Sequence, residues 1–179
     1  MNLKGSKTEQ NLWSAFEGES KVRMKYTYYA SQADKEGYKQ MAAIFQETAD
    51  NEKEHAKRFF KFLIGGSIRP TEENLLEAAE GELHEHSKLY PEYERIAREE
   101  GFHEIADVFR EIAEVEEEHE KRFRKLLANI KNQTVFKKTE PVKWKCRNCG
   151  YVHEGTEAPE VCPACDHPQS YYEVLCENY

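Results

Sequence analysis

The 179-residue sequence predicts a mainly α protein, with a four-helix bundle followed by a small metal-bound domain of strands and loops. Two observations predict this fold class. Residues 37–63 and 101–127 align without a gap at an offset of 64 residues, which indicates two related helical hairpins. Two Cys-x-x-Cys pairs then lie in a tail of 39 residues, which is too short to bury much core without a metal. We expect a bundle at 1–131, a linker at 132–140 and a four-cysteine domain at 141–179.

The bulk composition agrees with long amphipathic helices. Charged residues make up 34% of the chain and apolar residues 39%, a mixture that suits helices with surface ion pairs better than a thick β core. The net charge of -8 argues against a nucleic-acid-binding surface, which needs a basic footprint. No apolar run approaches the roughly 18–20 residues of a membrane span. Because residues 1–10 also lack the apolar core of a signal peptide, we expect a cytoplasmic location without a nucleic-acid or membrane partner.

The four expected helices follow one another along residues 12–33, 41–62, 75–96 and 105–126. Each carries a stripe with alternating three- and four-residue steps, as on the buried face of a bundle. Apolar residues occupy the ends of each stripe, whereas acids and histidines occupy its middle. These central residues are Glu19, Glu52, His55, Glu82, Glu85, Glu116 and His119.

The central acids and histidines predict a dinuclear metal site. Burying five facing carboxylates costs many kcal/mol unless a cation compensates their charge. Bundles that hold two metal ions use one Glu from each of two helices and a Glu-x-x-His from each of the other two. Here these are Glu19 and Glu82, with Glu52, His55, Glu116 and His119. A solvated run of charge would explain one Glu-x-x-His, but two at the repeat offset favour the metal site, and Glu85 is expected to be a further ligand.

The tail predicts a second, four-thiolate site. Its ligands are Cys146, Cys149, Cys162 and Cys165, with twelve residues between the two pairs, a spacing typical of tetrahedral metal sites. Spacing alone does not choose between zinc and iron. The remaining Cys176 is expected to be a partly buried spare thiol. The small core of this domain is expected to contain Trp144, Tyr151, Tyr171 and Tyr172.

Several stretches resemble the rubrerythrins along almost the whole chain. They are GES at 18–20, ETADNEKEHAKRFFKFL at 47–63, EGELHE at 80–85, YPEYERIAREEG at 90–101, EEEHEKRF at 116–123, and CRNCGYVHEG and CPAC in the tail. The resemblance implies a ferritin-like di-iron bundle and a rubredoxin-like iron domain. It implies a non-haem di-iron peroxidase that reduces hydrogen peroxide to water and protects against oxidative stress. The implied electron donor is a rubredoxin or an NAD(P)H-dependent reductase.

The same resemblance assigns roles to the predicted ligands. Glu52 and Glu116 would bridge two irons, and the terminal ligands would be Glu19, Glu82, Glu85, His55 and His119. One iron would exchange His55 for Glu85 with its redox state. Tyr26 and Tyr90 match positions near the family's metal site, where they either fill the core or hydrogen-bond to the ligands.

The visible departure from the family is the short connection at 65–71. A ferritin-like bundle has its second and third helices parallel, so this connection must return along a helix of roughly 40 Å. Seven residues reach at most about 25 Å. We therefore expect a domain-swapped homodimer, with a simple up-down-up-down bundle as the alternative. Two further functions stay open: a ferroxidase or iron-handling protein, and a non-redox module with zinc in the tail.

Overall fold

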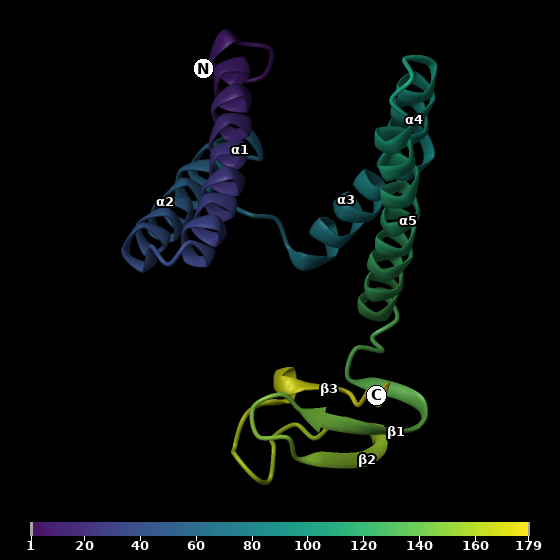
Figure 1. Cartoon of the computed structure of the whole chain (residues 1–179). Coiled ribbons are helices and arrows are strands. Elements are labelled where there is room, and N and C mark those ends of the chain that lie inside the picture. Colours follow the sequence, from purple (N-terminus) through teal and green to yellow (C-terminus); the bar gives the residue numbers. More distant parts are fainter. Residues whose placement is uncertain (1, 179) are drawn as a thin grey trace. The chain divides into compact units, whose positions relative to one another are not determined.

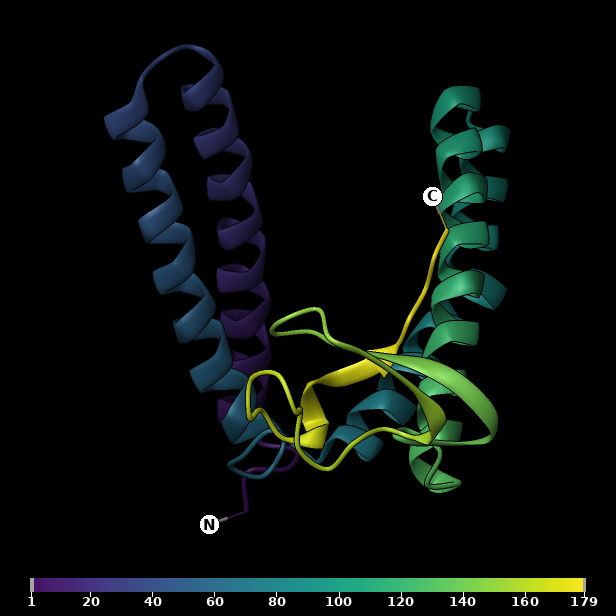
Figure 2. The ribbon, with the colours of Figure 1, turned by 90° about the horizontal axis from the view of Figure 1, so that it is seen from below.

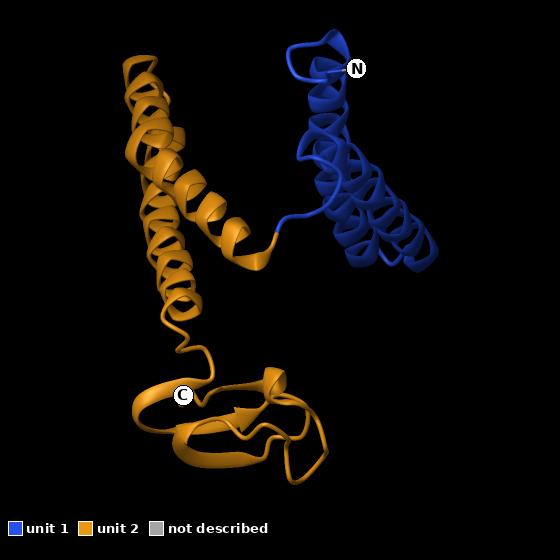
Figure 3. Cartoon of the chain, turned by 180° about the vertical axis from the view of Figure 1, so that it is seen from behind, with its two compact units in different colours: residues 1–69 blue, residues 70–179 orange. Residues whose placement is uncertain are grey.

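The computed structural model describes residues 2–178 and divides the chain into two compact units, 1–69 and 70–179 (Figure 3). The first unit is an antiparallel hairpin of α1 (Lys7–Lys35) and α2 (Lys39–Leu63), which lie side by side (Figures 1 and 2). Two side chains cap the start of α1: the Ser6 hydroxyl accepts a hydrogen bond from the Glu9 N–H, and the Glu9 carboxylate accepts one from the Gly5 N–H. These bonds fix the first helix where the sequence places it.

The second unit contains the matching hairpin. It consists of α3 (Thr71–His84), the π-helical segment η1 (Glu85–Leu89) and α4 (Tyr90–Glu99), followed by the antiparallel α5 (His103–Lys131). Because α3, η1 and α4 are contiguous, they form the single predicted third helix, widened at η1. Pro91 has no N–H to donate, so the α-helical ladder cannot be regular there.

The turns of the two hairpins have the same construction. Gly37 and Gly101 have φ of 87° and 85°, a conformation that glycine adopts without steric cost. The following residue bonds back to the helix, from the Tyr38 N–H to the Ala33 carbonyl and from the Phe102 N–H to the Ala97 carbonyl. This pattern is the Schellman motif, and its recurrence explains why both repeats turn at a glycine.

Small side chains occupy most of the fully buried positions of the helices. Seven of the eight buried helical residues are alanines, which allow the helices to approach closely; the eight are Ala30, Ala33, Ala49, Ala56, Ala79, Ala97, Ala106 and Leu127. The ends of the predicted stripes remain exposed instead, including Met41, Phe62, Ile105 and Leu126. Each hairpin therefore presents an apolar face that its own two helices do not cover.

The tail forms a three-stranded antiparallel sheet in the order β2-β1-β3. Its elements are β1 (Lys137–Cys146), β2 (Val152–Glu157), the 3₁₀ turn η2 (Gln169–Tyr171) and β3 (Tyr172–Val174). Strand β1 begins inside the range 132–140 that the sequence predicts as a linker. The buried core contains Trp144, Cys146, Ala158, Cys162 and Tyr172.

Three side chains of the tail differ from their expected burial. Trp144 and Tyr172 lie in the core as predicted, but Tyr151 and Tyr171 are exposed. Cys176 is also exposed rather than partly buried, because it follows β3 and lies beyond the last strand. Among the described residues, none of the helices has the length and apolar character needed to cross a membrane.

Candidate metal centres

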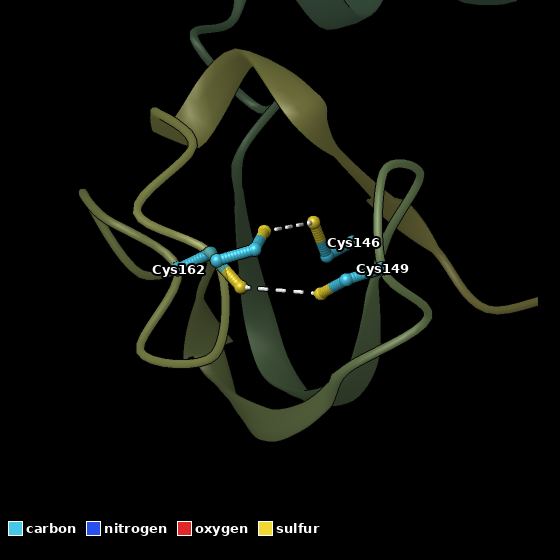
Figure 4. A group of neighbouring side chains, drawn as sticks. Cys146, Cys149 and Cys162 are labelled. Atoms are coloured by element: carbon cyan, nitrogen blue, oxygen red, sulfur yellow. Dashed lines mark hydrogen bonds between the residues drawn. The ribbon is translucent and has the colours of Figure 1, made fainter.

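The four predicted cysteines of the tail come together. Their sulfur atoms lie within 4.8 Å of one another, and the Cys146–Cys165 and Cys149–Cys162 sulfurs are 3.8 and 3.7 Å apart (Figure 4). A tetrahedral metal with bonds of about 2.3 Å to sulfur has sulfur–sulfur edges of about 3.8 Å. The observed spacing therefore fits a single iron or zinc ion held by four thiolates.

Two similar turns position these cysteines. In the first, Cys146 closes β1, its carbonyl accepts a bond from the Gly150 N–H, and Gly150 has a φ of 81°. In the second, the Cys162 carbonyl accepts a bond from the N–H of Asp166, whose φ is 55°. Each turn reverses the chain directly after a Cys-x-x-Cys pair and so aims both sulfurs at one point.

The surroundings of Cys162 favour its thiolate. Burial opposes ionisation, but the nearby Tyr172 hydroxyl, the Ala164 N–H and the neighbouring thiols outweigh it and lower the pKa of Cys162 to about 6. At Cys149 a hydrogen bond from the Tyr151 N–H lowers the pKa, but interactions with the other thiols, together with burial, outweigh it. One thiol of the group is thus ready to lose its proton near neutral pH, as metal binding requires.

The first hairpin gathers three of the predicted ligands. Glu19 on α1 and Glu52 and His55 on α2 have ligand atoms within 4.8 Å of one another. The His55 Nδ1 is 2.8 Å from a Glu52 carboxylate oxygen and 4.0 Å from one of Glu19. Burial raises the pKa of Glu19, and the hydrogen bond and charge of Glu52 raise it further. A cation bound between these carboxylates would offset their mutual repulsion.

The second hairpin repeats the arrangement. Glu82 on α3 and Glu116 and His119 on α5 form a group of the same size, with the His119 Nδ1 2.6 Å from Glu116 and 3.9 Å from Glu82. Burial raises the pKa of Glu82, and the charges of Glu116 and Glu85 add to the shift. The six residues of the two-helix motif thus divide into two equal groups, one in each unit.

Glu85 and Tyr90 lie at the two ends of the widened part of the third helix. The Tyr90 hydroxyl hydrogen-bonds to Glu85, and burial together with that carboxylate raises the pKa of Tyr90. The hydroxyl therefore stays protonated and acts as a hydrogen-bond donor toward Glu85. Tyr26 packs its ring against Tyr29 and Phe45, with centroids 6.2 and 6.0 Å apart, in agreement with a core-filling role.

A polar chain beside the second group was not predicted from the sequence. The His86 Nε2 is 2.8 Å from a carboxylate oxygen of Glu120, whose other oxygen accepts a 2.6 Å bond from the Arg124 Nε. His86 and Glu120 directly follow Glu85 and His119, and this adjacency was the available signal. The bond ties η1 to α5 next to the predicted ligands.

The first hairpin lacks this chain. Arg23 and Ala56 occupy the positions that correspond to His86 and Glu120 in the repeat. The Arg23 Nε is buried without a hydrogen-bond partner among the described residues. The two groups of ligands therefore match in their carboxylates and histidines but differ in the residues that support them.

Comparison with known families agrees with both sites. A family model described as "Rubrerythrin" matches residues 10–127, and one described as "Rubrerythrin, rubredoxin-like domain" matches residues 144–173. The chain belongs to the rubrerythrin family. The predicted fold class is confirmed, with a ferritin-like helical part and a rubredoxin-like tail. The predicted cofactors are confirmed as well: iron in the di-iron domain and iron at the four cysteines.

Individual relatives cover nearly the whole chain. The rubrerythrins of Nitratidesulfovibrio vulgaris and Porphyromonas gingivalis are each 53% identical over 189 residues, covering 99% of this chain and 99% and 94% of theirs. Nigerythrin of N. vulgaris is 31% identical over 177 residues, covering 92% of this chain and 85% of its own. A solved structure titled "Partially Reduced State of Nigerythrin" aligns with a TM-score of 0.37 at 30% identity, over 97% of this chain and 88% of that one.

Proposed function

We propose that this rubrerythrin is a non-haem di-iron peroxidase that reduces hydrogen peroxide to water. The observation that carries the proposal is the presence, in one chain, of two matched Glu/Glu/His groups and a separate four-cysteine site. The balanced reaction takes one peroxide, two electrons and two protons to two waters. Iron bound at the carboxylate–histidine centre would supply the two electrons together. Iron bound at the four cysteines would transfer electrons one at a time.

The predicted ligands would have different roles in holding the two irons of this centre. We propose that Glu52 and Glu116 bridge the two irons, with Glu19, Glu82, Glu85, His55 and His119 as terminal ligands. The close approach of each histidine to its glutamate supports these assignments. We propose that Glu85 exchanges with His55 as a ligand and that the Tyr90 hydroxyl, which lies near Glu85, orients that carboxylate.

Electrons would enter through the four-cysteine site from outside the chain. A rubredoxin or an NAD(P)H-dependent reductase is the proposed donor, because a one-electron site suits stepwise refilling from such a protein. Cys149 is exposed, which supports electron entry at that edge of the site. Protection of the cytoplasm against oxidative stress follows as the proposed role.

Variants at the two metal sites test whether the carboxylate–histidine centre reduces peroxide and the four-cysteine site supplies its electrons. We expect Glu116→Ala to abolish both single-turnover and sustained peroxide reduction, because it removes a bridging carboxylate. Cys149→Ser should keep a single turnover in the pre-reduced protein but lose sustained turnover with an NAD(P)H-linked donor. Glu117→Ala is the matched control, since Glu117 is exposed and pairs with Lys121. Full sustained turnover in Cys149→Ser would refute electron entry through the tail.

A homodimer with exchanged hairpins is the assembly we propose. Helix α2 has 25 residues, or about 38 Å, whereas residues 64–70 between α2 and α3 span at most about 25 Å. Parallel packing of α2 and α3 within one chain would require the longer distance. The exposed apolar ends of the stripes, such as Met41 and Ile105, support a partner surface that covers them.

Mixed dimers distinguish exchanged from unexchanged bundles. Glu52→Ala inactivates the first hairpin and Glu116→Ala the second, so each variant alone should be inactive. If hairpins are exchanged, a mixed dimer has one site with both defects and one intact site. Refolding an equal mixture should then restore about a quarter of the wild-type sites. If mixed dimers, verified by their mass, recover no activity, the exchange of hairpins between chains is excluded.

A ferroxidase or iron-handling role is the second candidate. The Glu/Glu/His groups favour it as much as they favour peroxide reduction, because similar carboxylate bundles handle iron. The four-cysteine site discriminates, since iron storage does not need it. Rapid consumption of ferrous iron with dioxygen, together with mineral formation, would support this candidate.

A further inference from the structure

The Tyr172 side chain lies beside the four-cysteine site and has a role that sequence reasoning does not assign. Tyr172 begins β3 and pairs with Cys146 in the sheet, so its ring enters the core of the tail. Only 4% of Tyr172 is exposed. Its hydroxyl oxygen is buried and has no conventional hydrogen-bond partner among the described residues. The polar group with which this hydroxyl interacts is the Cys162 thiol.

A buried hydroxyl without a partner is unfavourable, because it has lost its hydrogen bonds to water. A metal-bound thiolate would remove that cost, because it is a negatively charged acceptor, and hydrogen bonds to charged groups are the stronger kind. A tyrosine hydroxyl is protonated at neutral pH and has one O–H to donate. Tyr172 is therefore a donor placed beside Cys162.

We propose that the Tyr172 hydroxyl donates a hydrogen bond to the iron-bound Cys162 sulfur and thereby raises the reduction potential of the four-cysteine iron. Four thiolates with ferrous iron carry one more negative charge than with ferric iron. A donor to a thiolate sulfur therefore favours the ferrous form. This inference needs iron at the four cysteines but does not depend on peroxidase activity, so the two can fail separately.

The backbone supplies the other donors to these sulfurs, and a side-chain substitution does not remove them. The Tyr151 N–H bonds to Cys149, and the Ala164 N–H bonds to Cys162. Tyr172 adds a side-chain donor to the same Cys162 sulfur, at a fully buried position of the site. Its contribution can therefore be deleted without changing the backbone.

The first test is the midpoint potential of iron-loaded, full-length Tyr172→Phe, followed by the iron–thiolate absorption in a redox titration. We expect the equilibrium constant for reduction to fall by about three- to tenfold, where tenfold corresponds to 59 mV for one electron. Tyr171→Phe is the matched control, because it removes a hydroxyl from the adjacent, exposed tyrosine. A Tyr172→Phe potential equal to that of wild type would overturn the proposal.

The second test uses the wild-type side chain, so it stays decisive if the variant binds iron poorly. In full-length protein loaded with cadmium-113, the Tyr172 hydroxyl proton should exchange slowly with water. It should also show a scalar coupling to the metal across the Cys162 sulfur. This signal should be absent from Tyr172→Phe and present in Tyr171→Phe. A rapidly exchanging Tyr172 hydroxyl without coupling to cadmium would refute the hydrogen bond.

Discussion

The exposed apolar stripe of α5 gives a quantitative prediction about assembly. Ile105 and Leu126 lie at the two ends of this stripe and are 50% and 45% exposed in the single chain. Truncating a fully covered Ile or Leu to Ala costs about 2–5 kcal/mol. Because about half of each side chain is exposed, truncation should cost only about 1–2 kcal/mol if no other surface covers it.

The proposed bundle covers these side chains, so the larger cost should apply. We expect Ile105→Ala and Leu126→Ala each to lower the free energy of unfolding of the metal-free protein by about 2–5 kcal/mol. Urea denaturation followed by circular dichroism measures this, and sedimentation velocity reports the accompanying loss of dimer. Tyr28→Ala is the control, since Tyr28 is 62% exposed and lies opposite Glu19 on α1. If Ile105→Ala and Leu126→Ala lower the free energy of unfolding no more than Tyr28→Ala does, the proposal that another surface covers this stripe is refuted.

Three further predictions concern individual contacts. Trp144→Ala should destabilise the tail by about 3–5 kcal/mol, because the ring is fully buried. The variant should release its iron at a lower urea concentration than the wild type, and an unchanged urea midpoint of iron release would contradict this. Arg98 lowers the pKa of Asp107, so Asp107→Asn should destabilise the protein at pH 7. This deficit should vanish once the pH falls below the lowered pKa of Asp107, and a constant deficit in thermal melts would exclude the ion pair as its cause. His86→Leu removes the bond to Glu120 that anchors η1 to α5. The amount of iron bound per chain after anaerobic loading should therefore decrease. An unchanged amount of bound iron would show that the bond is dispensable.

Much of this architecture can be predicted from periodicity and spacing. The repeat offset places Gly37 and Gly101 at equivalent turns, and each Glu-x-x-His pair meets the Glu of the helix that it packs against. The Cys-x-x-Cys pairs are short-range motifs whose geometry is built into two local turns, so they also follow from sequence. These features depend on residues that lie close together along the chain.

Features that depend on longer-range packing could not be predicted. The π-helical segment η1 adds one residue to a helical turn, and the stripe of a regular helix does not reveal such an insertion. The His86–Glu120 bond joins residues 34 positions apart, and charged helices contain many such pairs that never meet. The exposure of Cys176 depends on where β3 ends, which the sequence pattern does not mark.

The most direct test of the central claim is an anaerobic titration of the fully reduced, iron-loaded protein with hydrogen peroxide. Absorption changes of the carboxylate–histidine irons and of the four-cysteine iron are followed separately. We expect rapid oxidation of the di-iron pair by about one equivalent of peroxide, followed by oxidation of the four-cysteine iron. Slow reaction with peroxide together with fast reaction with dioxygen would contradict the peroxidase and support the ferroxidase.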